Sequence, residues 1–327
     1  MTIVSFELKH SFFQGIIKAS PSKSYEQRIL AAGLMSDQGC IIENFGCSDD
    51  VIAARKIVSQ LGMHCNIDES GKLVCTKAER KDSSFKSLTL DCGESAMCAR
   101  FFTPITCLYE VPFILSGSGL LLNRPVADSF EVLAQMGCVF KSKDANLPVL
   151  FEKSLLKAGK YIIDGSKSSQ FISGLVFSMP TLKDDSQLII HNPVSFNYIL
   201  LSIDVLKSFG IIIRYKFDKR RNLEINIPGN QEYRSEQIYK VEGDWSGAAN
   251  FLVAAAVNGK IVIRGLSETS LQPDKSILNV FDIAGVKYFW DKEVLYVEKS
   301  RIKAFDFNAT DCPDLIPALV VLAAFAD

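Results

Sequence analysis

The sequence has no long apolar run, no CxxC pair, and only three histidines and two tryptophans. No apolar stretch reaches the roughly 18 residues that a membrane-spanning helix needs, so we expect no membrane partner. The nine cysteines are odd in number and scattered, which favours reduced thiols over a disulfide framework or a zinc site. The motifs HExxH, GxxxxGKS/T and GxSxG are absent, which argues against metallohydrolase, P-loop and serine-triad chemistry.

An excess of charge of either sign is also missing, because the formal net charge is -1 over 327 residues. A chain without a basic stripe is not expected to bind nucleic acid. The first residues, MTIVSFELKHSF, alternate like a strand and lack the features of a signal peptide. The sequence therefore predicts a soluble, cytoplasmic protein of about two domains, and we expect a monomer.

Four segments that read as helices end at a glycine, and these glycines recur about every 74 residues. A glycine just past a helix accepts the left-handed conformation that closes it. The segments are IVSQLG at Gly62, VLAQMG at Gly137, VLKSFG at Gly210 and VFDIAG at Gly285. Such a period indicates an internal repeat.

Each glycine precedes two alternating runs around a polar turn, which is typical of a β-hairpin. A strand, a helix and a second strand precede each of these glycine-ended helices, so the repeat reads βαβαββ and occurs four times. A fifth copy begins at AFDFNATDCPDLIPALVVLAAFA. The first helix of each repeat is nearly apolar all round, as in Phe251–Val257 and Leu315–Ala326, and must be buried on most sides. We predict an α/β fold in which sheets surround buried helices, with a domain boundary in the polar stretch Pro228–Tyr239.

Polar side chains gather where these first helices begin. Ser24, Ser95, Ser168 and Ser246 occupy similar places in their repeats, and Asp314 follows in the fifth. A helix start carries unpaired N–H groups and a partial positive charge, so it favours anions. The neighbouring polar residues at these starts are Lys23, Arg28, Arg100, Lys167, Ser169 and Gln170. Together they predict a site for phosphate or carboxylate groups.

Simpler interpretations exist for each of these residues. A Ser-Lys-Ser run before a helix can be a cap, and Arg28 can be a solvated charge on a helix face. Asp314 lies three residues after Asp311 in the first turn of its helix, where the helix dipole favours acids. Recurrence at the repeat period, with different polar residues each time, favours a ligand site because a cap needs only one side chain.

Six segments together resemble the signature segments of the 5-enolpyruvylshikimate-3-phosphate (EPSP) synthase family, in order and spacing, from about Lys18 to the last residue. They are SPSKSYEQRILAAGL, DCGESAMCARFF, DGSKSSQFISGL, NPVSFNYILLSIDVLKSFG, VEGDWSGAANFLVAAA and DCPDLIPALVVLAAFA. The resemblance implies an enolpyruvyl transferase-like fold with residues 19–238 as the first domain, and 1–18 plus 239–327 as an incomplete second domain. It also implies transfer of enolpyruvate from phosphoenolpyruvate to the 5-hydroxyl of shikimate 3-phosphate, without a metal or organic cofactor.

The resemblance assigns roles residue by residue. Lys23 would touch both substrates, while Ser24 and Arg28 would hold shikimate 3-phosphate. Asp314 would accept the proton of the attacking hydroxyl, and with Lys23 it forms the implied catalytic pair. The other implied contacts are the substrate phosphate for Ser168, Ser169 and Ser195, the phosphoenolpyruvate side for Gln170, and the shikimate pocket for Tyr198.

The chain also departs from the family pattern. Where the family has Asn-x-Gly-Thr at the second repeat's helix start, this chain has Glu94 and Ala96, and alanine narrows the phosphoenolpyruvate pocket. The family's phosphoenolpyruvate arginine falls on Leu120, and the Arg124 of the following Arg-Pro pair is no equivalent. The family's last stretch is absent, so we expect the helix Leu315–Ala326 to lack neighbours.

Alternative assignments remain open. One is a truncated or degenerate family member that binds shikimate 3-phosphate without turnover. Another is a UDP-N-acetylglucosamine enolpyruvyl transferase, although that family has Lys-Asn where this chain has Lys23 and Ser24. RNA 3'-phosphate cyclase is a more distant relative, and the missing basic stripe argues against it.

Overall fold

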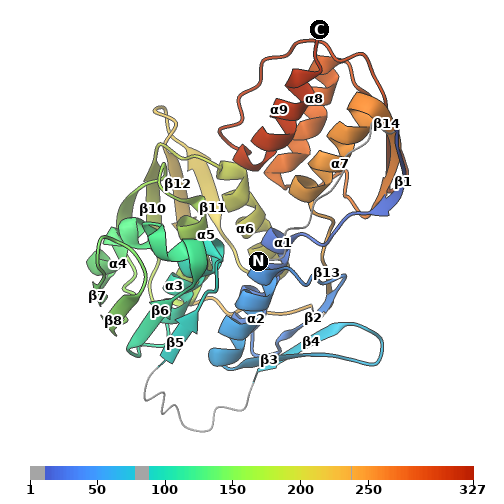
Figure 1. The fold of residues 1–327 in the computed structure, drawn as a ribbon. Coiled ribbons are helices and arrows are strands. Elements are labelled where there is room, and N and C mark those ends of the chain that lie inside the picture. The colour runs from blue at the N-terminus through green and yellow to red at the C-terminus, as the bar shows by residue number, and fades with distance from the viewer. Residues whose placement is uncertain (1–11, 78–87, 237) are drawn as a thin grey trace, which may run out of the picture. The chain divides into compact units, whose positions relative to one another are not determined.

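The computed structural model describes residues 12–77, 88–236 and 238–327 of the chain. The chain divides into two compact units (Figure 1). The larger is Pro21–Glu242, and the smaller combines the described part of Met1–Ser20 with Gly243–Asp327. Each unit has its own apolar core. No helix in the described ranges is long and apolar enough to cross a bilayer.

Among its described residues, the larger unit contains three four-stranded sheets, with orders β13-β2-β4-β3, β5-β6-β8-β7 and β11-β12-β10-β9. The strands are β2 (Cys40–Glu43), β3 (Met63–Ile67), β4 (Leu73–Lys77), β5 (Leu88–Asp91), β6 (Phe113–Ser116), β7 (Val139–Lys141), β8 (Val149–Lys153), β9 (Lys160–Asp164), β10 (Ser186–His191), β11 (Arg214–Phe217), β12 (Leu223–Ile227) and β13 (Ile238–Lys240). The helices are α1 (Lys23–Met35), α2 (Asp49–Gln60), α3 (Ala96–Cys107), α4 (Glu131–Met136), α5 (Ser169–Ser178) and α6 (Phe196–Ser208), with short 3₁₀ helices at η1 (Gly119–Asn123), η2 (Val126–Ser129) and η3 (Met179–Thr181).

The smaller unit contains one four-stranded sheet, in the order β1-β14-β16-β15. Its elements are β1 (Phe13–Lys18), α7 (Trp245–Asn258), β14 (Gly259–Arg264), η4 (Pro273–Ser276), α8 (Ile277–Ala284), β15 (Lys287–Asp291), β16 (Val294–Glu298), η5 (Pro313–Leu315) and α9 (Ile316–Ala324). All four sheets follow one pattern, in which a parallel pair is extended by an antiparallel hairpin. The predicted repeat is therefore confirmed at the level of sheets and hairpins.

The glycine ends of the second helices are confirmed as well. Gly62, Gly137, Gly210 and Gly285 all have positive φ values, between 75° and 114°. At Gly137 and Gly285 the left-handed residue is itself the helix C-cap. Only glycine adopts this conformation without steric penalty, so the period seen in the sequence marks the end of each amphipathic helix.

Two strands exchange places between the repeats. In the second and third repeats, the strand before the first helix pairs with the strand after it, as β5 does with β6. The strand β1 precedes α1 but pairs in parallel with β14 of the smaller unit. In turn, β13 precedes α7 but pairs in parallel with β2 of the larger unit. The chain therefore passes from one unit to the other after β1 and again after β13.

This exchange corrects the predicted boundary within Pro228–Tyr239. The division falls after Glu242, because β13 belongs to the sheet of β2. The stretch before β13 is also tied to the larger unit by backbone bonds, from Asn230 N–H to the Leu182 carbonyl and from Arg234 N–H to the Phe209 carbonyl. The polar composition indicates a connection here, but it does not indicate which of the two units the connection belongs to.

The first helices of the larger unit are buried, as their apolar composition predicted. Helix α3 packs on α5, and nearly all side chains of both are buried. The prediction is wrong for parts of the smaller unit, where Phe251 of α7 is exposed. Helix α9 also exposes several apolar side chains, at Ile316, Val320 and Val321, and Phe325 directly after it is exposed too. The expectation that this helix lacks neighbours is wrong, because α9 packs on α7 and buries Ala318, Leu319 and Leu322 in the core of the smaller unit.

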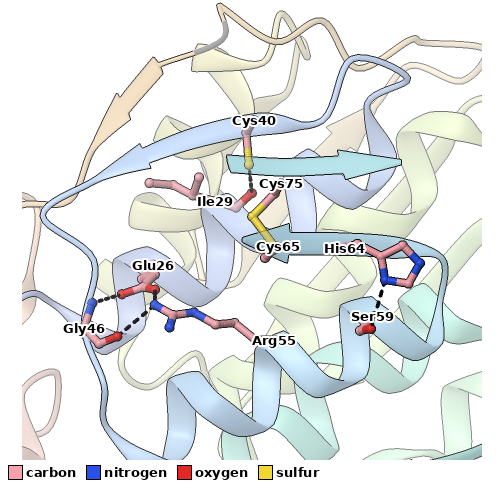
Figure 2. The surroundings of a disulfide bond; sticks show 9 residues. All are labelled: Glu26, Ile29, Cys40, Gly46, Arg55, Ser59, His64, Cys65 and Cys75. Carbon is pink, nitrogen blue, oxygen red and sulfur yellow. Dashed lines mark hydrogen bonds and ion pairs between the residues drawn. A yellow bond between two sulfur atoms is a disulfide. The ribbon is translucent and has the colours of Figure 1, made fainter. Parts of the chain in front are cut away.

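The expectation of reduced thiols throughout is wrong at one place. Cys65 on β3 and Cys75 on β4 form a disulfide (Figure 2). The two residues lie directly opposite each other in the antiparallel register. Cys40 on β2 is opposite Cys75 on the other side, and it remains a free thiol. Scattered sequence positions therefore meet in one row across three strands, which cysteine spacing alone does not indicate.

Candidate functional site

The start of α1 brings three helix ends of the larger unit together. Ser22 caps α1, and its hydroxyl oxygen accepts the N–H of Tyr25. The Lys23 ammonium then lies 3.0 Å from the carboxylate of Asp50, in the first turn of α2. Burial alone would raise the pKa of Asp50, but hydrogen bonds to Ser95 and Lys23 outweigh burial and lower the pKa. An ionised carboxylate thus links the starts of α1, α2 and α3.

Arg28 of α1 is fully enclosed, with 1% of its surface exposed. Its guanidinium donates to the Ser202 hydroxyl at 2.8 Å, to the Ser24 carbonyl at 2.6 Å and to the Tyr198 carbonyl at 3.1 Å. It also lies over the rings of Phe101 and Tyr198, 5.8 and 5.9 Å from their centroids. The interpretation of Arg28 as a solvated helix-face charge is therefore wrong.

The charge of Arg28 has no carboxylate within ion-pair distance among the described residues. Burial lowers the pKa of its guanidinium to about 10, so the group is still a cation at neutral pH. A buried cation that lacks an acidic partner within the protein is unfavourable, because its desolvation is not offset by ion pairing. An anion bound beside it would supply that missing interaction.

The serine-rich stretch before α5 combines a cap with further polar groups. Ser168 is the N-cap, and its hydroxyl accepts the N–H of Phe171 at 3.3 Å. Ser169 follows as the first residue of the helix and is buried. The Gln170 side-chain oxygen accepts a hydrogen bond from Arg100 of α3 at 3.3 Å. The capping interpretation is thus correct for Ser168 and leaves the roles of Ser169 and Gln170 to be explained.

The four serines placed together by the repeat period are not structurally equivalent. Ser95 and Ser168 are N-caps. Ser24 is the second residue of α1, since Ser22 is the cap there, and Ser246 is the second residue of α7, where Asp244 is the cap. The sequence interpretation was wrong by two residues, because the capping residue comes earlier in these two repeats. The Ser24 hydroxyl is therefore not used for capping.

Ser195 has an unusual backbone. It is the N-cap of α6 but has φ 51° and ψ 38°, in the left-handed region, and its side chain makes no capping bond. A non-glycine residue in this region carries about 1–2 kcal/mol of conformational strain. Such strain clusters at binding sites, and Tyr198, in the first turn of α6, contacts Arg28 through its carbonyl and ring. The start of α6 thus belongs beside Arg28.

The two departures from the family pattern meet in space. The Glu94 carboxylate accepts the backbone N–H of Leu120 at 3.1 Å. Leu120 itself is 70% exposed, and Ala96 is the half-buried first residue of α3. A side chain at Gly119 would collide with Glu94, because an added Cβ would lie 2.3 Å from its carboxyl carbon. Glu94 and the Gly119–Leu120 turn therefore fit together as a pair.

Of the predicted site residues, Asp314 alone belongs to the smaller unit. It lies in η5, directly before α9, and is exposed. The larger unit brings the others onto four helices: Lys23, Ser24 and Arg28 on α1, Ala96 on α3, Ser168, Ser169 and Gln170 at the start of α5, and Ser195 and Tyr198 at the start of α6.

Two further side chains of the site were missed in the sequence. Asp50 was not singled out in the sequence, and its contact with Lys23 is what brings it into the site. Ser202 lies four residues after Tyr198, on the same helix face, and this spacing was a usable signal. Within the described ranges, no group of three or more His, Cys, Asp or Glu side chains could hold a metal ion.

Comparison with known proteins identifies the chain's relatives. The family model for EPSP synthase (3-phosphoshikimate 1-carboxyvinyltransferase) matches residues 9–327. A 3-phosphoshikimate 1-carboxyvinyltransferase of Clostridium perfringens is 33% identical over 318 residues, covering 97% of this chain and 73% of the relative. One from Clostridium acetobutylicum is 35% identical over 315 residues, covering 96% and 72%.

Solved structures agree at the level of the fold. An EPSP synthase from Acinetobacter baumannii superposes with a TM-score of 0.75 at 18% identity, covering 97% of this chain and 72% of that one. The enolpyruvyl transferase NikO from Streptomyces tendae gives 0.72 at 15% identity, covering 97% and 74%. The repeat, the helix starts and these matches lead to one conclusion, that the chain belongs to the EPSP synthase family.

Proposed function

We propose that this protein transfers the enolpyruvyl group of phosphoenolpyruvate to the 5-hydroxyl of shikimate 3-phosphate, releasing phosphate. The observation that carries the proposal is the buried Arg28 guanidinium, which lacks a carboxylate partner in the described chain and lies beside Lys23 and Ser24 on α1. The match of residues 9–327 to the EPSP synthase family supports this reaction.

The proposed binding roles follow the helix starts. Arg28 and Ser24 hold the anionic shikimate 3-phosphate, Tyr198 lines its ring pocket, and the hydroxyls of Ser168, Ser169 and Ser195 bind the 3-phosphate. The amide N–H groups at the starts of α5 and α6 favour that phosphate further. Gln170 and Ala96 lie on the phosphoenolpyruvate side, and Lys23 contacts both substrates.

The proposed chemistry needs one base and one acid. The 5-hydroxyl oxygen bonds to C2 of phosphoenolpyruvate while Asp314 takes the hydroxyl proton and the Lys23 ammonium gives a proton to C3. The Lys23 amine then takes a proton back from C3 as the bond from C2 to the phosphate oxygen breaks, which restores the double bond, and the departing phosphate takes the proton held by Asp314. The restored Lys23 ammonium stabilises the negative charge of the released phosphate.

One observation favours a second candidate, a family member that binds shikimate 3-phosphate without turnover. The Glu94 carboxylate accepts the backbone N–H of Leu120. Leu120 stands where the family has a phosphoenolpyruvate-binding arginine. A carboxylate there repels an anion instead of attracting one.

Phosphate release separates the candidates. The purified protein is mixed with phosphoenolpyruvate and either shikimate 3-phosphate or UDP-N-acetylglucosamine. We expect phosphate only with the first acceptor. Release with the second alone would assign the chain to the other transferase. Calorimetric binding of shikimate 3-phosphate without any release would favour the non-catalytic member.

We further propose that the protein is a cytoplasmic monomer. Metabolic enzymes of this class act on phosphorylated substrates that occur inside cells. Disulfides are rare in that compartment, so the Cys65–Cys75 bond makes a direct test possible. Thiol trapping in freshly lysed cells reports the redox state of the pair, and sedimentation gives the assembly. Recovery from an extracytoplasmic fraction would contradict the location.

A further inference from the structure

A second ion pair, with a buried carboxylate and a partly exposed guanidinium, joins the helix of Lys23 and Arg28 to α2. Glu26 of α1 has no exposed surface. One oxygen of its carboxylate accepts from the Arg55 guanidinium at 2.5 Å, and the other accepts the Gly46 backbone N–H at 2.6 Å. Arg55 also donates to the Gly46 carbonyl at 2.8 Å and lies 4.9 Å over the Phe45 ring. Figure 2 shows Glu26 and Arg55 meeting at both backbone groups of Gly46.

These contacts join the two helices whose starts meet at the site. Glu26 belongs to α1, Arg55 belongs to α2, and Gly46 lies in the connection that leads from β2 into α2. The connection is therefore held to α1 through its N–H and to α2 through its carbonyl. Four residues after Gly46, Asp50 contacts the Lys23 ammonium at 3.0 Å. The ion pair and this contact fasten the same two helices at neighbouring points.

Stability alone does not explain why an ion pair occupies this position. Taking two charges out of water costs several kcal/mol per ion, and well-packed apolar side chains of similar volume often stabilise as much or more. Apolar side chains would leave the partly buried N–H and carbonyl of Gly46 without these partners. What the charged pair adds is a fixed position for the segment leading into α2.

We propose that Glu26 and Arg55 are positioning residues, which hold the start of α2 so that the Asp50 carboxylate stays against the Lys23 ammonium. Neither residue touches substrate; they act through Asp50 on Lys23. The proposal rests on the proposed function only for its effect on turnover, because the position of Lys23 can be measured without substrate.

The test is the rate at which acetic anhydride acetylates Lys23, followed by mass spectrometry. Acetic anhydride reacts with the neutral amine, and a lysine freed from a partly exposed ion pair presents this form more often. Its labelling should therefore be about two- to fivefold faster for an interaction of this kind. We expect that increase in Glu26→Gln, in Arg55→Lys and in the reference variant Asp50→Asn. The matched control is Lys77→Gln, which breaks the 2.7 Å pair of Lys77 with Asp37 beyond the other end of α1. Lys77→Gln should leave Lys23 labelling unchanged.

Two outcomes overturn the proposal. The first is a wild-type labelling rate in Glu26→Gln and Arg55→Lys while Asp50→Asn labels faster. The second is an equal increase in Lys77→Gln, which would indicate general loosening. Thermal unfolding is measured alongside, and the more conservative Arg55→Lys decides if Glu26→Gln does not fold.

Kinetics distinguish this proposal from the proposed function. If both hold, Glu26→Gln lowers kcat while the KM for shikimate 3-phosphate changes little, and Lys23→Met abolishes turnover. If Lys23→Met turns over normally, the proposed function of Lys23 fails, yet the labelling result still decides the positioning role. Faster labelling with unchanged kcat would overturn only the link to turnover.

Discussion

The guanidinium of Arg28 is satisfied by hydrogen bonds but not neutralised by any carboxylate in the described chain. Its three oxygen partners orient the group, and its charge remains available to a ligand. Sequence alone found Arg28 through its place on the helix start, but it could not distinguish a buried group from a solvated one. That distinction depends on α6, which supplies Ser202 and Tyr198 from 174 and 170 positions further along the chain.

Replacement of this group should affect the binding of shikimate 3-phosphate directly. A lost hydrogen bond to a charged group is worth about 1.5–3 kcal/mol, so we expect Arg28→Ala to bind at least about tenfold more weakly in calorimetry. Arg214→Ala is the control, because Arg214 is an exposed strand residue. Equal affinities of the Arg28→Ala variant and the wild type would remove Arg28 from the site.

Glu26 makes stability depend on pH with a definite sign. Burial raises the pKa of its carboxyl, and the bonds to Gly46 and Arg55 only partly oppose this. Between the ordinary glutamate pKa and the raised one, the folded state binds more protons than the unfolded state. Stability therefore falls as pH rises through that window. The effect is isolated by measuring the urea unfolding free energies of the wild type and Glu26→Gln from about pH 4 to 7, where a glutamate with a raised pKa titrates.

The unfolding free energy of the wild type minus that of Glu26→Gln should fall as pH rises through the window. A difference that does not change with pH would show that Glu26 keeps its ordinary pKa in the folded protein. Lys77→Gln again serves as the control, since it removes an ion pair without touching Glu26.

Among the elements, the β3–β4 hairpin carries the Cys65–Cys75 disulfide, which closes a sequence separation of 10. A closed loop of this size restricts the unfolded chain and is worth roughly 2–3 kcal/mol. Reduction should therefore lower the urea midpoint of the wild type, whereas a Cys65→Ser, Cys75→Ser double variant should not respond to reductant. If both respond alike, the reductant acts elsewhere, and Cys47→Ser checks the exposed thiol.

The elements also show which parts of the fold are readable from sequence. Helix ends at Gly137 and Gly285 were predicted because the left-handed conformation has a local residue signature. The disulfide was not, because it depends on the register that places Cys65 opposite Cys75. The position of β13 was also not predicted. Its partner β2 lies almost 200 residues earlier in the chain, and nonlocal pairing leaves no local signature.

For the whole molecule, the exchange of β1 and β13 means that the smaller unit is built from two separate segments, whereas the larger unit is the continuous segment Pro21–Glu242. The sheet of β2 is completed by β13, and the sheet of β14 is completed by β1. Tyr239 of β13 also stacks on Phe209 of the larger unit, with ring centroids 4.3 Å apart. A fragment that ends before β13 therefore lacks both a strand and a core contact.

That fragment, residues 21–236, should be less stable than the same unit within the whole protein. We expect it to exchange the amide hydrogens of β2 faster, because β2 loses its parallel partner. The comparison is with residues 21–242, which retain β13. Similar protection of β2 in the two fragments would show that β13 contributes little to the larger unit.

The proposed residues of binding and of proton transfer belong to different units, so one can be altered without the other. Arg28, Ser168 and Ser169 lie in the larger unit, and Asp314 lies in the smaller. A lost general base lowers rate by about 10²-fold or more, so Asp314→Asn should lower kcat by that factor. Affinity for shikimate 3-phosphate should stay within a few-fold, because the larger unit holds most of the proposed ligands.

The control is Asp311→Asn, which removes the same charge three residues earlier. Its kcat should be near that of the wild type. If both variants lose the same activity, Asp314 acts only through the helix dipole and the base lies elsewhere.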